Sequence, residues 1–358
     1  MHSEQILAIN PGSTSTKIAV YEGTKELFMK NIKHTCEDLQ GFKIISEQFE
    51  FRKNIILNEL KNSGFKIEHF AVIVGCGGLV KPIISGVYEV NDALIKDLRI
   101  GVQGQHASNL GGLIAHEIAQ MLPSAKAYIA DPVVVDELEP IARISGHPLF
   151  ERTSVFHALN QKAIARQYAK SISRQYTELN LIIAHLGGGI SVGAHRKGRV
   201  IDVNQALNGE GPFSPERSGT LPVGALVRTC FSGDYTEDQI KKMITGKGGY
   251  VAYLGTNDAY EVEKRAASGD EKAQLIQDAM AYQVAKEIGA MSTVLKGNVD
   301  AILLTGGISY GKPFVSAVSE RVQHIAPIFV YPGEDEMRAL AMNGLMVLKG
   351  ELEPKVYQ

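Results

Sequence analysis

Short apolar runs that end in glycine-rich turns recur along the chain and predict buried β-strands. Residues 6–10 lead through a turn of small residues into a second apolar run at 17–21. Residues 181–186 lead through three consecutive glycines into an alternating run, which ends at a Lys-Gly turn at 197–198. Runs of this kind are typical of strands and hairpins. The same strand, turn, strand unit in both halves of the chain indicates a duplicated core whose turns face each other across a cleft.

Other segments complete an α/β pattern. Three further buried strands are predicted from apolar runs that end in glycine, threonine or an acid: residues 70–74, 127–131 and 301–305. Helices are predicted where apolar residues recur every three or four positions, or where a capping residue precedes such a run. These helices span residues 38–60, 105–121, 154–168, 273–296 and 337–349. In an open α/β fold of this kind, ligands bind at the carboxyl ends of the strands.

Length and composition narrow the function classes. A chain of 358 residues exceeds what one core normally holds, so two domains are predicted, with the crossover near residues 146–148. The net charge of −2 and the dispersed basic residues indicate neither nucleic acid nor a membrane surface as a partner. The three cysteines have no paired or metal-ligand spacing, and no apolar run approaches the roughly 20 residues of a membrane span. Because the amino terminus also lacks a signal-peptide pattern, a reducing cytoplasmic location is expected.

The glycine-rich turns are the first candidates for chemistry. The glycines at 187–189 carry no side chains, so main-chain N–H groups there can converge on a polyanion such as a phosphate. In the two equivalent turns a polar residue ends the first strand, Asn10 in one and His185 in the other. A third strand ends in Thr305-Gly306-Gly307. Two phosphate-binding turns and one nucleoside-side turn are the simplest interpretation, and an ordinary glycine-rich turn is the alternative for each.

Several polar residues have both a functional and a structural interpretation. Asp131, at a strand end, is either a magnesium or substrate anchor or the cap of the next turn. His106 is either a ligand contact or, more simply, a residue at a helix start. The acids before the final helix are favoured as partners of its dipole. The irregular segment at 204–224 is typical of a functional loop, and Arg217 is its single basic side chain.

Six blocks spread over nearly the whole length together resemble the acetokinase family in order and spacing: residues 10–17, 106–110, 131–137, 184–189, 215–220 and 305–307. The resemblance implies the α/β duplicated actin-like ATPase (ribonuclease H-like) fold, with an interdomain cleft between two domains that close on ATP. It implies residues 1–148 with the C-terminal helix 337–358 as the acyl-substrate and phosphate domain, and residues 149–336 as the nucleotide-binding domain. A homodimer or a higher homo-oligomer is also implied.

The activity implied by the resemblance is reversible, in-line transfer of the γ-phosphoryl group of ATP to a short-chain carboxylate, butyrate or a branched analogue, with Mg²⁺ as cofactor and ADP as the other product. The matches to the family's catalytic positions are Arg217, His185, Asp131 and Glu336, and the two acids also match its magnesium-side carboxylates. The matches to its nucleotide-binding positions are Asn10, Ser13, Ser15, Lys17, Gly187, Gly188, Gly189, Thr305, Gly306 and Gly307. Those around the acyl substrate are His106, Asn109, Cys76, Gly77, Gly78 and Val133. Because a carboxylate acceptor is already ionised at neutral pH, the reaction needs placement and charge neutralisation rather than a strong base.

One position departs from the family pattern. Cys76 stands where members that phosphorylate butyrate carry an arginine before the Gly-Gly of the strand-end loop. A cysteine cannot pair bidentately with a carboxylate or phosphoryl group. The loss of such a donor costs on the order of 3 kcal/mol, or about a hundredfold in rate, unless Lys81 compensates in part. Two alternatives therefore stay open: a nucleotide-binding paralogue with weakened or altered acceptor activity, and a sugar or polyol kinase on the same fold with Asp131 as base.

Overall fold

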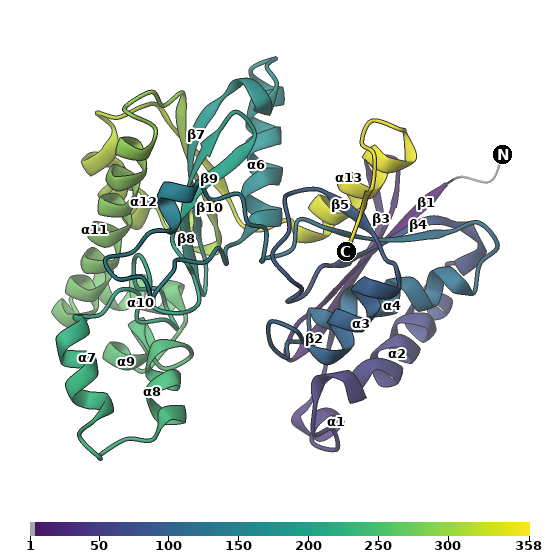
Figure 1. Ribbon diagram of the computed structural model, residues 1–358, viewed down its shortest axis with the longest axis horizontal. Helices are drawn as coiled ribbons and strands as arrows, with labels where there is room; N and C mark the ends of the chain where they lie inside the picture. The colour runs from purple at the N-terminus through teal and green to yellow at the C-terminus, as the bar shows by residue number, and fades with distance from the viewer. Residues whose placement is uncertain (1–3) are drawn as a thin grey trace. The chain divides into compact units, whose positions relative to one another are not determined.

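The computed structural model describes residues 4–358, which fold into two compact units (Figure 1). The first unit contains the chain up to Val135 and also Asp335–Gln358, and the second contains Asp136–Glu334. Both junctions lie earlier in the chain than the expected boundaries at 148/149 and 336/337. The first junction is earlier because Glu137 forms a buried ion pair with Lys162 of the second unit, with Oε2 and Nζ 2.8 Å apart.

A seven-stranded sheet forms the centre of the first unit (Figure 1). Its strands, in spatial order, are β12 (Lys355–Val356), β5 (Val87–Glu89), β6 (Lys126–Ala130), β4 (Phe70–Cys76), β1 (Gln5–Pro11), β2 (Ser15–Glu22) and β3 (Lys25–Lys33). β1, β2 and β3 form an antiparallel meander, and β4 lies parallel to both β1 and β6. The predicted strand, turn, strand unit is thus the hairpin of β1 and β2.

Helices cover both faces of this sheet. The helices of the first unit are α1 (Cys36–Leu39), α2 (Phe49–Asn62), α3 (Asp92–Ile100), α4 (Asn109–Gln120) and α13 (Glu336–Leu348). Successive strand residues point to opposite faces, so Leu7 and Ile73 join the apolar cluster of α4, whereas Val72 and Val74 meet α13. A Cβ at Gly344 would lie 2.7 Å from Val74 Cγ2, so this glycine lets α13 approach the sheet closely.

The second unit has a five-stranded sheet, also covered on both faces. Its strands, in spatial order, are β11 (Ile328–Pro332), β10 (Ala301–Gly306), β7 (Asn180–Leu186), β8 (Ile190–Arg196) and β9 (Arg199–Val203). Its helices are α5 (Pro140–Arg143), α6 (Ala158–Ser171), α7 (Val223–Cys230), α8 (Glu237–Ile244), α9 (Gly249–Leu254), α10 (Ala259–Ala267), α11 (Glu271–Val294) and α12 (Lys312–Val322). Ile182 and Ala184 pack against α11, and the alternate residues Leu181 and Ile183 pack against α6.

The two sheets repeat one topology. The order β3-β2-β1-β4-β6 in the first unit corresponds to β9-β8-β7-β10-β11 in the second, and each pairing has the same sense in both. The predicted duplication of an α/β core is therefore confirmed. The turn between β1 and β2 and the turn between β7 and β8 occupy equivalent places in the two units.

One predicted helix is interrupted, and two others begin later than expected. The segment at 38–60 forms α1, a 3₁₀ turn at Ile45–Gln48 and α2 rather than one helix. The helix expected from residue 105 begins at Asn109. The helix expected after Ser154 begins at Ala158, because residues 155–157 are irregular and Val155 O accepts a hydrogen bond from Ala206 N at 2.8 Å.

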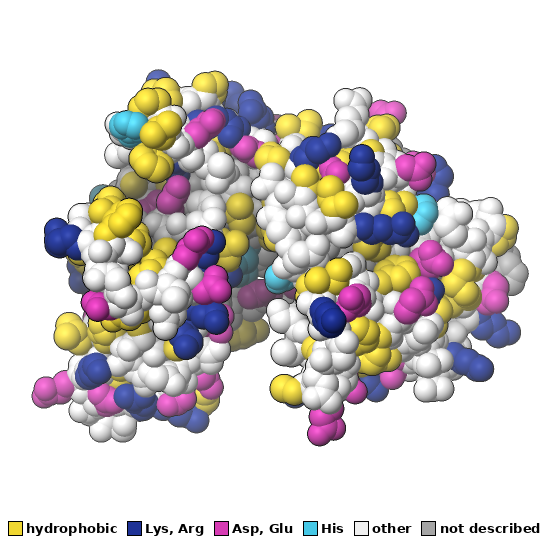
Figure 2. Space-filling model, turned by 60° about the horizontal axis from the view of Figure 1, so that its bottom comes forward, with side chains coloured by type: hydrophobic (Ala, Val, Ile, Leu, Met, Phe, Trp, Pro, Cys, Tyr) yellow, Lys and Arg dark blue, Asp and Glu magenta, His cyan; other side chains and the backbone are white. Residues whose placement is uncertain are grey.

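Charges of both signs are mixed on the face of the molecule seen in Figure 2. On the face seen in Figure 2, lysine and arginine side chains are interspersed with acidic and apolar ones, in keeping with the net charge of −2. Among residues 4–358, no helix combines the length and the apolar character that crossing a bilayer requires.

Candidate active site

Main-chain hydrogen bonds hold the turn between β1 and β2 in shape. Gly12 N donates to Ser15 O at 2.8 Å, and Thr14 O accepts from His34 N at 2.9 Å. The side chains of Ser13 and Lys17, both expected to bind nucleotide, are exposed, and that of Ser15 is half-buried. The turn therefore presents its hydroxyls and the Lys17 ammonium to the outside of the first unit.

Arg52 of α2 holds this turn from behind. Its guanidinium, fully buried, donates to Gly12 O at 2.8 Å, Ser15 O at 3.0 Å, Ser13 O at 3.2 Å and the hydroxyl of Thr16 at 3.0 Å. No Asp or Glu of residues 4–358 forms an ion pair with it. Burial lowers the pKa of Arg52, but an arginine stays charged in proteins. A positive charge is therefore fixed behind the turn without a carboxylate to neutralise it.

Both carboxylates predicted to bind the metal, Asp131 and Glu336, lie in the first unit. Asn10 Nδ2 donates to Glu336 Oε2 at 2.5 Å, which joins the end of β1 to the first residue of α13. Asp131 is buried with a positive φ of 38°, and its Oδ1 accepts from the Ser85 hydroxyl at 2.6 Å and Gly86 N at 2.9 Å. Within the described residues, no three His, Cys, Asp or Glu side chains converge in a metal-binding group. This donor set fits a magnesium ion held mainly by phosphate and water, with one or two carboxylates.

The strand-end loop at 76–79 is held by α4. Asn109 is buried, and its Oδ1 accepts from Leu79 N at 2.8 Å while its Nδ2 donates to Gly104 O at 3.0 Å. A Cβ at Gly78 would lie 2.8 Å from Asn109 Cα, so the glycine permits this close packing. The Asn109 amide thus already serves two backbone partners and positions Gly77 and Gly78.

Cys76 ends β4 as a neutral group. Its thiol donates to Ser108 O at 3.4 Å. Burial raises the pKa of the Cys76 thiol, the Glu336 carboxylate raises it further, and Arg52 opposes them. A thiol of this kind is neither a charged donor nor a reactive nucleophile at neutral pH. Lys81, the possible substitute for the family arginine, is instead paired with Asp97 at 3.2 Å.

The other expected acyl-site residues lie at the surface of the first unit. His106 is exposed, and its Nδ1 lies 2.8 Å from the Ser108 hydroxyl. Val133 is 37% exposed, whereas the valines that follow it are buried. Val133 is therefore accessible at the surface, Val134 and Val135 lie in the core beside it, and its contact with an acyl chain stays a prediction.

In the second unit, the three glycines between β7 and β8 make room for the side chains of Arg217 and His185. Gly187 N donates to Gly189 O at 3.1 Å, and Gly188 O accepts from the Ser214 hydroxyl at 2.6 Å. A Cβ at Gly189 would coincide with the guanidinium of Arg217, and a Cβ at Gly187 would lie 3.0 Å from His185 Nε2. None of the three has a positive φ, so glycine is required here for close approach rather than for backbone conformation.

Arg217 lies across this turn with most of its donors unused. Its Nη1 donates to Ala206 O at 2.5 Å. Burial lowers its pKa, and the neighbouring Glu216 opposes the shift. No carboxylate of residues 4–358 is in ion-pair contact with the Arg217 guanidinium. An arginine without a carboxylate partner can bind a phosphoryl group directly, because no existing ion pair has to break first.

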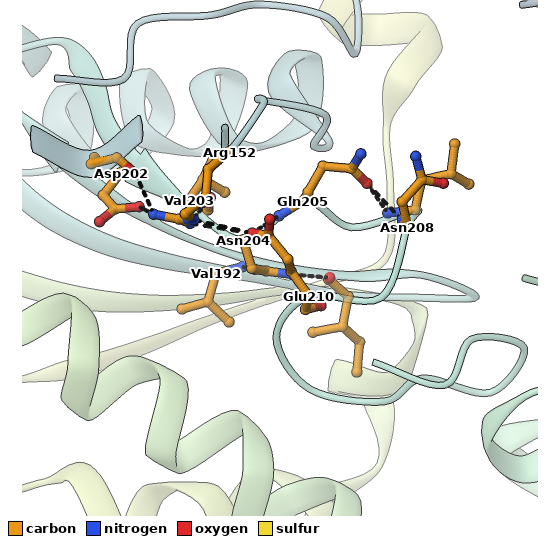
Figure 3. A network of polar contacts seen from close by, with 11 residues as sticks. Arg152, Val192, Asp202, Val203, Asn204, Gln205, Asn208 and Glu210 are labelled. Atoms are coloured by element: carbon orange, nitrogen blue, oxygen red, sulfur yellow. Dashed lines mark hydrogen bonds and ion pairs between the residues drawn. The ribbon is translucent and has the colours of Figure 1, made fainter. Parts of the chain in front are cut away.

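A polar network holds the start of the loop that carries Arg217 (Figure 3). Arg152 contacts Asp202 at 2.9 Å and Glu210 at 3.3 Å, and it donates to Val203 O at 2.9 Å. Asn204 links the loop to β8, because its Oδ1 accepts from Val192 N at 2.7 Å and its Nδ2 donates to Ile190 O at 3.1 Å. Gln205 closes the next turn through Asn208 N at 2.6 Å (Figure 3). These hydrogen bonds and ion pairs therefore hold the first part of the irregular segment at 204–224 in a defined conformation.

His185 is held in place by three partners. It is 1% exposed, and its Nδ1 lies 2.8 Å from Asn160 Oδ1. Its Nε2 lies 3.4 Å from Glu334 Oε1. The ring of His157 stacks on it, with 3.8 Å between centroids and 12° between planes. The pKa of His157 is well below its usual range because of burial and the nearby His185 and Arg217.

The third turn borders a cavity. Thr305 Oγ1 donates to Gly333 O at 3.2 Å, and Gly306, with φ of 91°, packs directly on the backbone of Leu186. Gly307 then opens a 3₁₀ turn, Gly307–Tyr310. A cavity of about 140 Å³ lies beside it, and its lining includes Tyr250, Tyr260, Glu263, Gln277, Ile308 and Tyr310. The second and third turns thus adjoin each other within one unit.

Sequence reasoning missed three of these residues. Arg52 had a readable signal, because it lies at helical spacing from Phe49 and Ile56 and so places a charge within an apolar stripe. His157 and Glu334 had none, because each acquires its partner only through folding, at His185. Glu336 was the acid chosen from the tail, and Glu334 lies beside His185 instead.

Solved structures identify the fold. *Porphyromonas gingivalis* acetate kinase matches with a TM-score of 0.78 and 18% identity, over 96% of this chain and all of that one. *Entamoeba histolytica* acetate kinase gives 0.75 with 14% identity, over 97% of this chain and 99% of that one. A propionate kinase of *Francisella tularensis* gives 0.72 with 19% identity, over 95% and 98%. The molecule therefore has the duplicated, actin-like ATPase fold of these kinases.

The sequence comparisons are more specific. The profile of the Acetokinase family matches residues 148–331. Butyrate kinase 2 of *Clostridium acetobutylicum* is 58% identical over 354 residues, which is 99% of both chains, and butyrate kinase 1 of that organism is 56% identical over the same share. The chain belongs to the acetokinase family.

Proposed function

We propose that the protein transfers the γ-phosphoryl group of ATP reversibly to a short-chain carboxylate, butyrate or a branched analogue, and so forms an acyl phosphate. The observation that carries this proposal is the identity of 56–58% with two butyrate kinases over 99% of the chain. A sugar or polyol kinase would need a base beside a hydroxyl, and the Asp131 carboxylate already accepts from Ser85 and Gly86. A carboxylate acceptor needs no such base.

The second unit would bind the nucleotide. The nucleoside would enter the cavity beside Gly307, and the phosphates would follow the adjoining glycines at 187–189. Arg217, with donors to spare, would neutralise the charge that builds on the three phosphoryl oxygens. His185, which Asn160 holds in position, would also contact the transferring phosphoryl group at this turn.

The first unit would bind the acyl substrate and the metal. Glu336, Asp131 and the amide oxygen of Asn10 would hold Mg²⁺, directly or through water. When bound, Mg²⁺ would neutralise the β- and γ-phosphate oxygens. The acyl chain would lie against Val133 and the Gly77–Gly78 loop, with His106 at its carboxylate. The charge of Arg52 behind the first turn would favour any anion that approaches that turn.

The decisive experiment compares acceptors. Purified protein with MgATP is given carboxylates from acetate to branched pentanoates and, separately, sugars and polyols, with hydroxylamine present to trap acyl phosphate as the hydroxamate. We expect hydroxamate and ADP with short carboxylates only. Phosphorylation of an alcohol would overturn the proposal, and nucleotide binding without carboxylate-dependent ADP release would favour a paralogue that has lost acceptor activity through Cys76. The homo-oligomeric state and the cytoplasmic location stay predictions, open to light scattering and cell fractionation.

A further inference from the structure

The segment Lys355–Tyr357 is fastened to the loop at 77–86, which connects β4 to β5. β12 pairs in parallel with β5, and the Tyr357 side chain that follows it is 2% exposed. The Tyr357 hydroxyl lies 3.1 Å from Lys81 N and 2.8 Å from Asp97 Oδ2. A side chain far along the chain therefore contacts the main chain in the middle of this loop.

Each hydrogen bond of the Tyr357 hydroxyl has one possible direction. A main-chain N–H can only donate, so the hydroxyl accepts from Lys81 N. A carboxylate can only accept, so the single hydroxyl proton goes to Asp97. This hydrogen bond and the Lys81 ammonium hold the pKa of Asp97 below its usual range, so the carboxylate stays ionised at neutral pH. Asn91, the N-cap of α3, donates to Tyr357 O at 2.8 Å. The hydroxyl thus joins α3 to the loop.

The same segment also contacts the end of the loop. Lys355 Nζ donates to Ser85 O at 2.5 Å. A Cβ at Gly86 would lie 3.0 Å from Lys355 Cε, so the lysine stem packs on the glycine backbone. The Ser85 hydroxyl and Gly86 N in turn donate to Asp131 Oδ1, at 2.6 and 2.9 Å. The segment therefore holds the loop at two places, and the second lies next to a residue that is assigned to the reaction.

The beginning of the loop belongs to the proposed acyl-substrate site. Gly77–Gly78 directly follow β4, and Leu79 N donates to Asn109 Oδ1 at 2.8 Å. Tyr357 holds the main-chain N–H of Lys81, two positions further on. Because two nearby peptide groups are fixed from different elements, the loop cannot shift over a ligand without breaking one of these bonds.

We infer that Tyr357 is a positioning residue for the acyl substrate, because its hydroxyl, through Lys81 N, holds the Gly77–Gly78 part of the loop where the acyl chain would lie. This inference rests on the proposed function. A loop that is ordered before the substrate arrives binds it more tightly, because less conformational entropy is lost on binding. Loss of the hydroxyl should therefore weaken acceptor binding and leave nucleotide binding, in the second unit, unchanged. A hydroxyl with a merely structural role would change stability alone.

Tyr357→Phe removes the hydroxyl and keeps the ring. Hydrogen–deuterium exchange should be about threefold faster in peptides that cover residues 77–86. KM for butyrate should rise about tenfold, with kcat within about threefold and KM for MgATP within about twofold of the native values. An unchanged KM for butyrate would overturn the inference, as would an equal rise in both KM values or a raised KM with unchanged exchange. If the native protein phosphorylates no carboxylate, the proposed function fails, and the exchange still decides whether Tyr357 holds the loop.

Asp97→Asn separates the position of the loop from the charge beside it. The asparagine Oδ1 can still accept the Tyr357 proton, but it no longer forms an ion pair with the Lys81 ammonium. We expect KM for butyrate to stay within about threefold of the native value, because an exposed ion pair contributes little. A rise as large as that in Tyr357→Phe would show that the charge of Lys81 binds the acceptor, and would overturn the role of Tyr357.

Tyr21→Phe provides the matched control. Tyr21 is 1% exposed and lies in the same unit, and its hydroxyl also donates to a carboxylate, that of Glu26, at 2.9 Å. Its removal should lower stability and leave both KM for butyrate and exchange at 77–86 within about twofold of the native values. A rise in KM as large as that in Tyr357→Phe would show that any lost buried hydroxyl has this effect, and would count against the inference.

Discussion

The turn between β1 and β2 and the turn between β7 and β8 are equivalent by topology, yet they are supported in opposite ways. The first turn has polar side chains on its outer side. Behind it, the buried guanidinium of Arg52 donates hydrogen bonds to the carbonyls of Gly12, Ser13 and Ser15. The second has no side chains of its own, and Arg217 occupies the space that a Cβ at Gly189 would fill. One turn is held from within the core by Arg52, and the other is overlaid by the side chain of Arg217.

The difference indicates how a duplicated fold divides its work. In the first unit the arginine is satisfied by backbone oxygens, so it is structural and its charge acts at a distance. In the second unit the arginine keeps donors unused and its loop is fixed by other residues, around Arg152 and Asn204 (Figure 3). The second turn should therefore govern the rate, and the first should govern stability and anion affinity.

The largest effect is expected for Arg217→Ala. Removal of the guanidinium should lower kcat about a thousandfold and change KM for MgATP by less than fivefold, because the group acts on charge that develops in the transition state. Steady-state kinetics in both directions measure this. Arg217→Lys should recover a part only, since an ammonium lacks the forked donors. A large rise in nucleotide Kd with kcat preserved would reject the assigned role.

Arg52→Gln tests the other side of the comparison. It leaves three turn carbonyls without their buried donor, so the free energy of unfolding should fall by about 3 kcal/mol. Urea unfolding measures this, and KM for MgATP should rise more than kcat falls. Arg52→Lys should retain the anion affinity better than the stability, because one ammonium keeps the charge but cannot serve all the carbonyls. Equal losses in the two variants would contradict a separate role for the charge.

Gly189→Ala tests whether the second turn acts through Arg217. The new Cβ would meet the guanidinium, which must move, and kcat should fall about a hundredfold. In a double-mutant cycle, Gly189→Ala should cost almost nothing when Arg217 is already alanine. If the two losses multiply instead, the glycine is needed for the phosphate itself.

The sequence was sufficient for the fold and for the turns, but not for their supports. Strands, glycine turns and their repetition are written in neighbouring residues, so the duplicated α/β core and the positions of Asn10, His185 and Gly187–Gly189 could be predicted. The grip of Arg52 on Gly12 joins residues far apart in the chain, and the stack of His157 on His185 forms between different elements. Such contacts depend on packing that no local pattern encodes. The compact units divide at a different residue from the predicted domains for the same reason, since the Glu137–Lys162 pair is also distant in sequence.

The smallest effect is expected for a change at Glu287, which lies near Arg152. Arg152 and Arg52 both support a turn or loop, but they differ in their carboxylate partners. Arg52 has no carboxylate partner among residues 4–358, whereas Arg152 has Asp202 and Glu210, and the charges of these three groups act on Glu287 of α11. Burial raises the pKa of Glu287, Arg152 opposes the rise, and the two other carboxylates add to it. Because the pKa is higher in the folded state than in the unfolded chain, Glu287 supports folding fully only below its unfolded pKa, and that support is lost as pH rises through the folded pKa.

Glu287→Gln removes this loss and keeps the shape of the side chain. The variant should be more stable than the native protein at pH 8, by on the order of 1 kcal/mol, and the difference should shrink as pH falls towards 5. Urea unfolding of both proteins across this range measures it. The same substitution at Glu210 should destabilise, since that carboxylate bonds Arg152 directly and also accepts from Gln205 N at 3.1 Å. A Glu287→Gln protein that is less stable at pH 8 would contradict this prediction. It would mean that the positive charge of Arg152 needs all three carboxylates to balance it.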